Sequence, residues 1–134
     1  MTPASFWSVL LAAVSAVILG MAWYHPRAFG TLWLRLGHIT PEHAERAAER
    51  MVTHSALSFG ACLLMALALS VLAGALELEG AGGSVVLASF LWLGFAVPLL
   101  SGSFLWEQRS SRFYGINAGY WLVALMVMSF IVVP

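Results

Sequence analysis

The chain has little charge and a single cysteine. Its 134 residues include six basic and six acidic side chains, all arginine and glutamate, so charged residues make up 9% and the formal net charge is zero. Soluble domains carry about 25% charged residues, so this composition excludes a water-soluble domain. The lack of net positive charge or of a basic run removes the electrostatic basis for nucleic-acid binding. The one cysteine, Cys62, excludes an intrachain disulfide and any multi-cysteine metal site.

Motifs of familiar chemistry are also missing. The sequence contains no phosphate-binding loop, nucleophile elbow, zinc-protease helix or haem-attachment motif. His38 and His43 lie near Glu42, but a spacing of five at a loop-to-helix boundary is not that of metal ligands. We therefore predict neither a metal site nor a cofactor. No ionisable side chain falls near the middle of a long apolar run, which counts against an ion-coupled pump with a central charged site.

Long apolar runs dominate what is present. Hydrophobic residues make up 61% of the chain, and its mean hydropathy is +0.90. A helix needs about 20 apolar residues to cross about 30 Å of hydrocarbon. The sequence supplies four such runs, at residues 4–24, 51–76, 84–106 and 113–133. Because backbone polar groups in lipid must be satisfied within each segment, we predict an all-α fold, an integral membrane four-helix bundle that forms one transmembrane domain over residues 1–134.

The arginines predict the orientation in the membrane. All six lie in the segments 25–50 and 107–112, and the segments on the opposite face contain no arginine or lysine. Since basic residues are retained in cytoplasmic loops, we expect these two segments inside and both termini on the outer face of the cell inner (cytoplasmic) membrane. Thr40, Pro41 and Glu42 are typical of a helix start. With no breaker before the second span, we expect that span to continue a cytoplasmic helical extension from about Pro41.

Small side chains recur every four residues in the spans and predict helix packing. In lipid, helices approach closely through small residues because the hydrophobic effect does not drive them together. We interpret Cys62 as a member of such a row rather than as a nucleophile, since an apolar medium disfavours a charged thiolate. The residues to which we assign packing are Ala12, Ala16, Gly20, Ser58, Cys62, Ala66, Ser70, Gly74, Gly115 and Gly119. Pro98, with Gly94 and Gly102 on either side, predicts a kink in the third span.

Polar and aromatic residues gather toward the expected cytoplasmic ends of the spans. One hypothesis is a polar inner vestibule, and its candidate members are His25, His54, Ser58, Glu107, Arg109, Asn117 and Tyr120. The alternative is that tryptophan and tyrosine form an interfacial belt while the charges meet water and headgroups. We favour the belt for Trp7, Trp33 and Trp121. A glutamate beside an arginine, as in 107–109, is more often a structural ion pair than a general acid.

Several of these residues carry a family resemblance. The chain resembles a small membrane family known as domain of unknown function 1761, through the segment GMAWYHPRAFGTLW (20–33) and through Gly94-Phe95, Pro98, Glu107-Gln-Arg-Ser and Asn117-x-Gly119-Tyr120. The Trp-Tyr-x-Pro and Phe-Gly-x-x-Trp elements are its specific part. The resemblance implies a four-helix integral membrane protein, and it implies no activity.

The sequence therefore favours a non-catalytic structural or accessory component. We expect it to sit in the lipid bilayer as a homo-oligomer or as a subunit of a larger membrane complex. One alternative is a small oligomeric permease or channel for a neutral or weakly charged solute. Another is a membrane enzyme that modifies lipid or quinone, for which His54 or Glu107 would be the acid-base candidates. We assign no catalytic residue.

Overall fold

The computed structural model describes residues 4–134, and within this range the chain is helical with no strand. This confirms the predicted all-α fold. The elements in chain order are α1 (Phe6–Trp23), α2 (Gly30–Leu36), α3 (Pro41–Glu49), α4 (Met51–Ala75), α5 (Gly80–Leu91), the π-helical turn η1 (Trp92–Ala96), α6 (Val97–Leu105) and α7 (Ser111–Val132).

Four helices are long and apolar enough to cross a membrane. They are α1, α4, α7 and the continuous segment Gly80–Leu105 that joins α5, η1 and α6. The third span begins at Gly80, four residues before the predicted start at 84. Gly80 has a positive φ of 63°, and its backbone N–H donates to the carbonyl of Pro134 at 2.6 Å. A contact with the far end of the chain therefore helps to hold the glycine-rich segment at the start of a helix, and the four spans define a multi-pass membrane protein.

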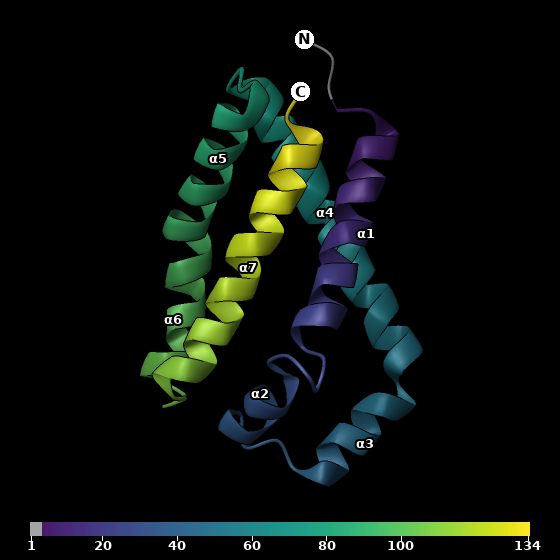
Figure 1. The fold of residues 1–134 in the computed structure, drawn as a ribbon, viewed down its shortest axis with the longest axis vertical. Helices are drawn as coiled ribbons and strands as arrows, with labels where there is room; N and C mark the ends of the chain where they lie inside the picture. Colours follow the sequence, from purple (N-terminus) through teal and green to yellow (C-terminus); the bar gives the residue numbers. More distant parts are fainter. Residues whose placement is uncertain (1–3) are drawn as a thin grey trace.

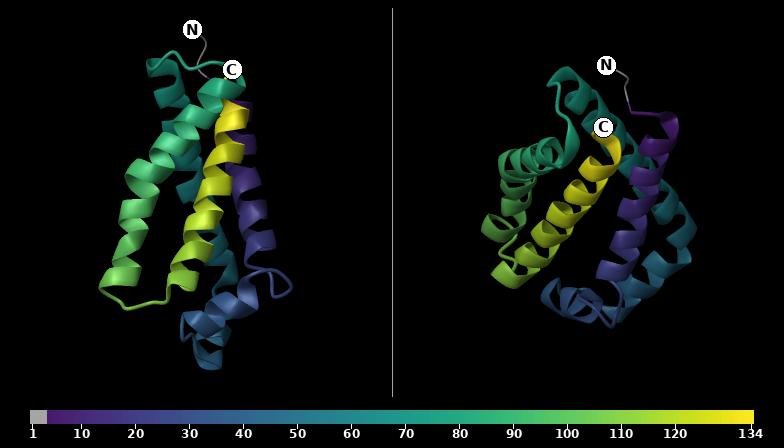
Figure 2. Two further views of the ribbon diagram at one scale, coloured as in Figure 1. Left: turned by 60° about the vertical axis from the view of Figure 1, so that its left-hand side comes forward. Right: turned by 45° about the horizontal axis from the view of Figure 1, so that its top comes forward.

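Helix α7 lies in the middle of the bundle (Figure 1). It has α1 on one flank and α5 and α6 on the other, while α4 crosses behind α1 (Figure 2). Small residues dominate the most deeply buried positions of the core, as expected for helices that approach closely in lipid. Residues with none of their surface exposed are Ala12, Ala13, Ala16, Ala66, Ala88, Ala124, Met128 and Ser129.

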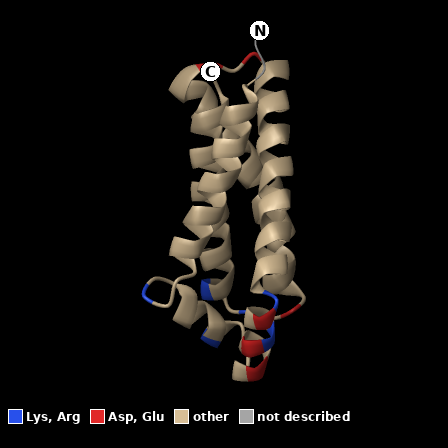
Figure 3. Cartoon of the chain, turned by 90° about the vertical axis from the view of Figure 1, so that its right-hand side faces the viewer, with Lys and Arg blue, Asp and Glu red and all other residues tan. Residues whose placement is uncertain are grey.

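Charge distinguishes the two ends of the bundle (Figure 3). We call the end formed by residues 25–50 and 107–112 the arginine end, because it holds all six arginines. We call the other end, with Ser5, Glu77, Glu79 and Pro134, the terminal end. Helices α2 and α3 lie at the arginine end, beyond the tip of α1 (Figure 1).

The helical extension before the second span exists as α3, but the segment 25–50 differs from our expectation in two ways. The second span does not run on from Pro41, because α3 ends at Glu49 and α4 begins at Met51. Arg50 between them has φ −105° and ψ 19°, outside the helical range, although no residue type marks the break. Helix α2 was not predicted at all. It is only seven residues long, and its N-cap, Phe29, makes no side-chain capping hydrogen bond.

Candidate functional site: an aromatic cluster around Asn117

The side chain of Asn117 in α7 is the centre of a hydrogen-bonded aromatic cluster. Its Oδ1 accepts a hydrogen bond from the Tyr24 hydroxyl at 2.8 Å and another from the Trp33 indole N–H at 3.0 Å. Because an indole N–H can only donate, the amide atom that faces Trp33 is the oxygen. We call Trp23, Tyr24, Trp33, Asn117 and Tyr120 the Asn117 cluster.

Two further hydrogen bonds of the cluster fix α1 against α7. The Trp23 indole donates to the backbone carbonyl of Ile116 at 3.1 Å. In the opposite direction, the Tyr120 hydroxyl donates to the carbonyl of Ala16 at 2.9 Å, and Tyr120 is buried. The ring centroid of Tyr24 lies 5.5 Å from that of Tyr120 and 5.4 Å from that of Trp33. Rings at this spacing pack favourably, so the cluster combines hydrogen bonds with aromatic packing.

Glycines allow the aromatic side chains of the cluster to approach the neighbouring backbone closely. A Cβ built on Gly20 would lie 3.2 Å from the Tyr120 hydroxyl oxygen, and one built on Gly119 would lie 3.2 Å from Cζ2 of Trp23. Gly30 is more constrained, because its Cβ would lie 2.8 Å from the backbone carbonyl carbon of Tyr24 and closer still to that carbonyl's oxygen. Gly30 therefore allows the tight turn after α1 that brings α2, and with it Trp33, under Asn117.

Arg109, in the connection between α6 and α7, links this connection to the end of α2. Its guanidinium donates to the backbone carbonyl of Gly37, at the end of α2. It also lies 5.7 Å from the ring centroid of Phe113, which in turn stacks on Trp33 at 5.8 Å. Glu107 forms an ion pair with Arg109 at 3.8 Å. Glu107 thus pairs with its arginine neighbour at the exposed edge of the bundle.

The structure brings only some of the predicted vestibule residues together. Asn117 and Tyr120 belong to the cluster, and Glu107 and Arg109 pair beside it. His25 is exposed in the turn after α1, where its Nδ1 accepts the Arg27 backbone N–H at 3.2 Å. His54 and Ser58 are exposed on α4, and no hydrogen bond among the described residues joins their side chains to the cluster.

The residues assigned to packing differ in how deeply they are buried. Five of the packing residues are buried, Gly20, Gly74 and Gly119 are partly buried, and Ser58 and Gly115 are exposed. The five buried ones are Ala12, Ala16, Cys62, Ala66 and Ser70. Pro98 lies in the first turn of α6, directly after the π-helical turn η1. In a regular α-helix the ring of Pro98 would clash with the backbone carbonyl four residues earlier. That carbonyl lies in the π-helical turn η1, whose wider winding changes this geometry.

The cluster contains a residue that was placed elsewhere on sequence grounds. Trp33, for which we favour an interfacial belt, also donates a hydrogen bond to Asn117, because its helix α2 folds back under the bundle. A sequence signal for this role did exist, since an asparagine within an apolar span requires a polar partner. Within residues 4–134, no group of three or more His, Cys, Asp or Glu side chains is placed to hold a metal ion.

Comparison with known proteins identifies a family without assigning a role. Residues 7–133 match the family described as "Protein of unknown function (DUF1761)", which confirms the resemblance seen in the sequence. No curated protein and no solved structure matches the chain. The Asn117 cluster therefore has to be interpreted from its own geometry.

Proposed function

The chain belongs to the DUF1761 family, and we propose that it is a non-catalytic membrane component that packs with copies of itself or with a larger membrane complex. Two features support this role. The polar groups of the Asn117 cluster bond to one another and to the backbone, which suits a rigid scaffold better than a reaction site. The other feature is an arm that extends from the bundle, and the proposal depends on it most.

The arm consists of residues 41–58, which comprise α3 and the first turns of α4. Every residue of the arm is exposed except Ala44, which is partly buried. The apolar side chains in the first turns of α4 are exposed, since Met51 is 62% exposed, Val52 84% and Leu57 68%. Isolated helices shorter than about 12 to 15 residues are marginal in water. A nine-residue helix without a buried side chain therefore gains from a partner that covers it.

The side chains of the arm favour a protein partner. Its charges are mixed in sign, with Glu42, Glu45 and Glu49 interspersed with Arg46 and Arg50. A segment that binds anionic lipid headgroups is instead rich in lysine and arginine. Mixed charges beside exposed apolar side chains resemble the polar rim and apolar centre of a protein interface.

We further infer that the protein lies in the inner membrane with its arginine end in the cytoplasm. This orientation follows from the restriction of all six arginines to that end. It places α3 inside the cell, the first turns of α4 at the cytoplasmic side of the membrane, and both termini outside. Fusion of a reporter that is active only in the cytoplasm after Pro134 should give no signal, and a strong signal would reverse the orientation.

Cysteine cross-linking in native membranes tests the role of the arm. Cys62 is buried, so it can be replaced by alanine to give a background without thiols. Glu45→Cys and Val52→Cys should each form adducts larger than the monomer with a short cross-linker that carries a maleimide for the introduced thiol and a photoactivatable group for a neighbouring chain. Glu79→Cys, which replaces another exposed glutamate but lies at the terminal end, is the matched control for Glu45→Cys and should stay monomeric. If both arm variants also remain monomeric, the arm has no protein partner and the proposal fails.

A further inference from the structure

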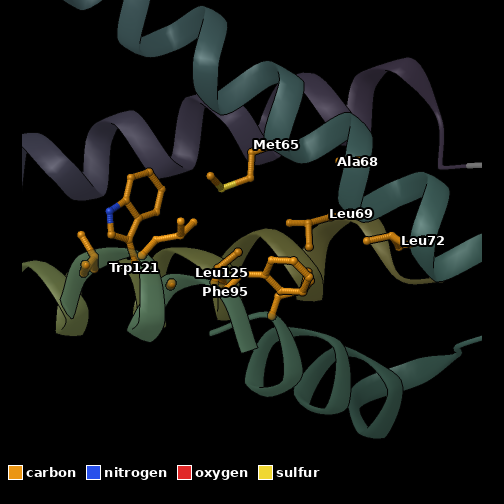
Figure 4. A pocket seen from close by; sticks show the side chains of 11 residues that line it. Met65, Ala68, Leu69, Leu72, Phe95, Trp121 and Leu125 are labelled. Atoms are coloured by element: carbon orange, nitrogen blue, oxygen red, sulfur yellow. The ribbon is translucent and has the colours of Figure 1, made fainter. Parts of the chain in front are cut away.

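An apolar groove lies on the side of α7 that faces away from α1. Its volume is about 390 Å³, and its walls come from α4, from the α5–η1–α6 segment and from α7. Figure 4 shows Met65, Leu69 and Leu72 of α4 above Leu125 of α7 and Phe95 of η1, with Trp121 at one end. Of the described side chains that line the groove, none carries a hydroxyl, an amide or a charge.

The π-helical turn η1 shapes one wall of this groove. Phe95 and Ala96, at the end of the turn, are both lining residues. Hydrogen bonds hold the wall to α7 on either side of them, from the Trp92 indole to the Ala118 carbonyl at 2.7 Å and from the Tyr114 hydroxyl to the Val97 carbonyl at 3.3 Å. Among the described residues, these hydrogen bonds join the wall to α7, and none joins it to α4. Turns of this kind are frequent at functional sites.

We infer that this groove holds an acyl chain of a bilayer phospholipid. The lining residues all belong to membrane-spanning helices, and most of them lie in the central turns, while the charged side chains gather at the ends of the bundle (Figure 3). A cavity lined only by apolar side chains does not hold ordered water. Phe95 on its edge is 56% exposed and therefore faces hydrocarbon in a membrane. The surrounding bilayer supplies acyl chains at this depth.

The side chains of the groove favour a flexible chain over a protein helix. Helices that dock in lipid need small residues, which allow backbones to approach closely. Only two of the lining residues, Ala68 and Ala96, are small, while the others are leucine, methionine, phenylalanine or tryptophan. A quinone has two carbonyl groups that each need a hydrogen-bond donor. Among the described lining residues, only the Trp121 indole offers a side-chain N–H, so the groove favours a quinone less than an acyl chain. An acyl chain needs neither close backbones nor a donor.

The groove is separate from the arm, so this inference does not depend on a protein partner. The test uses the full chain in phosphatidylcholine vesicles that contain a fraction of phosphatidylcholine with a photoactivatable group at the middle of one acyl chain. Irradiation should give adducts concentrated on the α4 and η1 walls, at Met65, Leu72 and Phe95. Ala68→Trp should fill the groove and lower the adduct yield there by about tenfold.

Two further variants keep the test interpretable. Ala61→Trp places the same side chain two helical turns earlier on α4, where Ala61 is exposed but does not line the groove, and it should leave the yield unchanged. Ala96→Phe fills the groove from the opposite wall and should act like Ala68→Trp. Equal yields for Ala61→Trp and Ala68→Trp, or adducts spread evenly over all lipid-facing residues, would overturn the inference. Disulfide formation between copies through Leu72→Cys would also overturn it in favour of a second chain.

Discussion

The two flanks of α7 are packed in different ways. Toward α1, Gly119 and Asn117 meet Trp23, Tyr24 and Trp33 through close contacts and hydrogen bonds. Toward α4 and η1, the same helix offers Trp121 and Leu125, and these side chains border the groove. Within fewer than ten residues, α7 therefore packs tightly against α1 on one flank and borders an apolar groove on the other.

This difference follows from what holds helices together in a membrane. A leucine gains little by leaving lipid for a protein contact, because lipid tails are as apolar as the leucine itself. Close contact then requires small residues or hydrogen bonds. The α1 flank has both, whereas the groove walls have large side chains and no hydrogen bond that crosses to α4 among those of the described residues. The two flanks should therefore respond differently to added volume and to lost hydrogen bonds.

The largest effect should come from Gly30→Ala. The new Cβ would lie within 3 Å of three backbone atoms, two of Tyr24 and one of His25, and backbone cannot rotate aside as a side chain can. The turn that brings Trp33 to Asn117 would have to open, at a cost of about 3 kcal/mol, the upper range for overpacking. Thermal unfolding in mild detergent, followed by circular dichroism, measures this loss.

Gly60→Ala in α4 is the control for this change. A Cβ at Gly60 meets no atom within 4 Å, and alanine favours a helix over glycine by roughly 0.5 to 1 kcal/mol. The control should therefore be neutral or slightly stabilising. Equal destabilisation by both substitutions would mean that the tight turn does not limit the stability of the bundle.

Adding volume should distinguish the two flanks. Ala12 has no exposed surface in the core of α1, and Ala12→Leu should destabilise the fold by about 2 kcal/mol. Ala68 lines the groove, and Ala68→Leu should change stability by less than about 0.5 kcal/mol because space is already present. Denaturation in mixed micelles with increasing detergent strength gives both values. If Ala68→Leu costs as much as Ala12→Leu, the groove is closed in the folded protein and the two flanks are alike.

Loss of the amide should have a smaller effect. Asn117→Leu keeps the size of the side chain but leaves the Tyr24 and Trp33 donors without their acceptor, at a cost of about 1 to 2 kcal/mol. In a double-mutant cycle with Tyr24→Phe, the coupling should be near the average of about 0.6 kcal/mol for hydrogen bonds between membrane helices.

Tyr114→Phe provides the matched control for this cycle. The Tyr114 hydroxyl donates to Val97 on the groove side of α7, so its loss should add to that of Asn117 without coupling. Coupling of similar size in both cycles would show that the hydrogen bonds of the two flanks act as a single network.

The sequence predicts the spans well because length and polarity are local properties. The expected spans 4–24 and 51–76 correspond closely to α1 and α4, since hydrocarbon thickness sets their length. The start of α5 was placed too late because glycines normally indicate a turn. Here the Gly80 N–H bonds to Pro134, a partner that no local pattern indicates.

The candidate site was only partly predictable for the same reason. Asn117 stood out as a polar residue in an apolar run, but its partners Tyr24 and Trp33 lie 93 and 84 residues away. Trp33 is carried by α2, a short helix without a side-chain cap that the sequence did not indicate. The groove depends on the gap between α4 and η1, and that gap is a property of how helices pack rather than of any one segment.

The smallest expected effect concerns the start of α3, which lies on neither flank. The pKa of the Glu42 carboxyl is lowered from its usual 4.5, because the carboxylate accepts hydrogen bonds from its own backbone N–H and from the Thr40 hydroxyl. A carboxyl whose pKa is lowered in the folded state adds stability at pH values above its unfolded-state pKa. This contribution is lost as the pH falls through the folded-state pKa. Thr40→Ala should therefore raise the pKa of Glu42 toward 4.5, as measured by carbon NMR of its carboxyl group.

Thr40→Ser retains the hydroxyl and should leave that pKa unchanged. Thr40 also caps α3 by accepting the His43 backbone N–H, so the alanine variant should fray α3 while the serine variant should not. Because α3 has no buried residue, the unfolding of the bundle itself should not change in either variant. If Thr40→Ala lowers the unfolding temperature of the whole bundle, the arm is packed on the α1 flank and is not free to receive a partner.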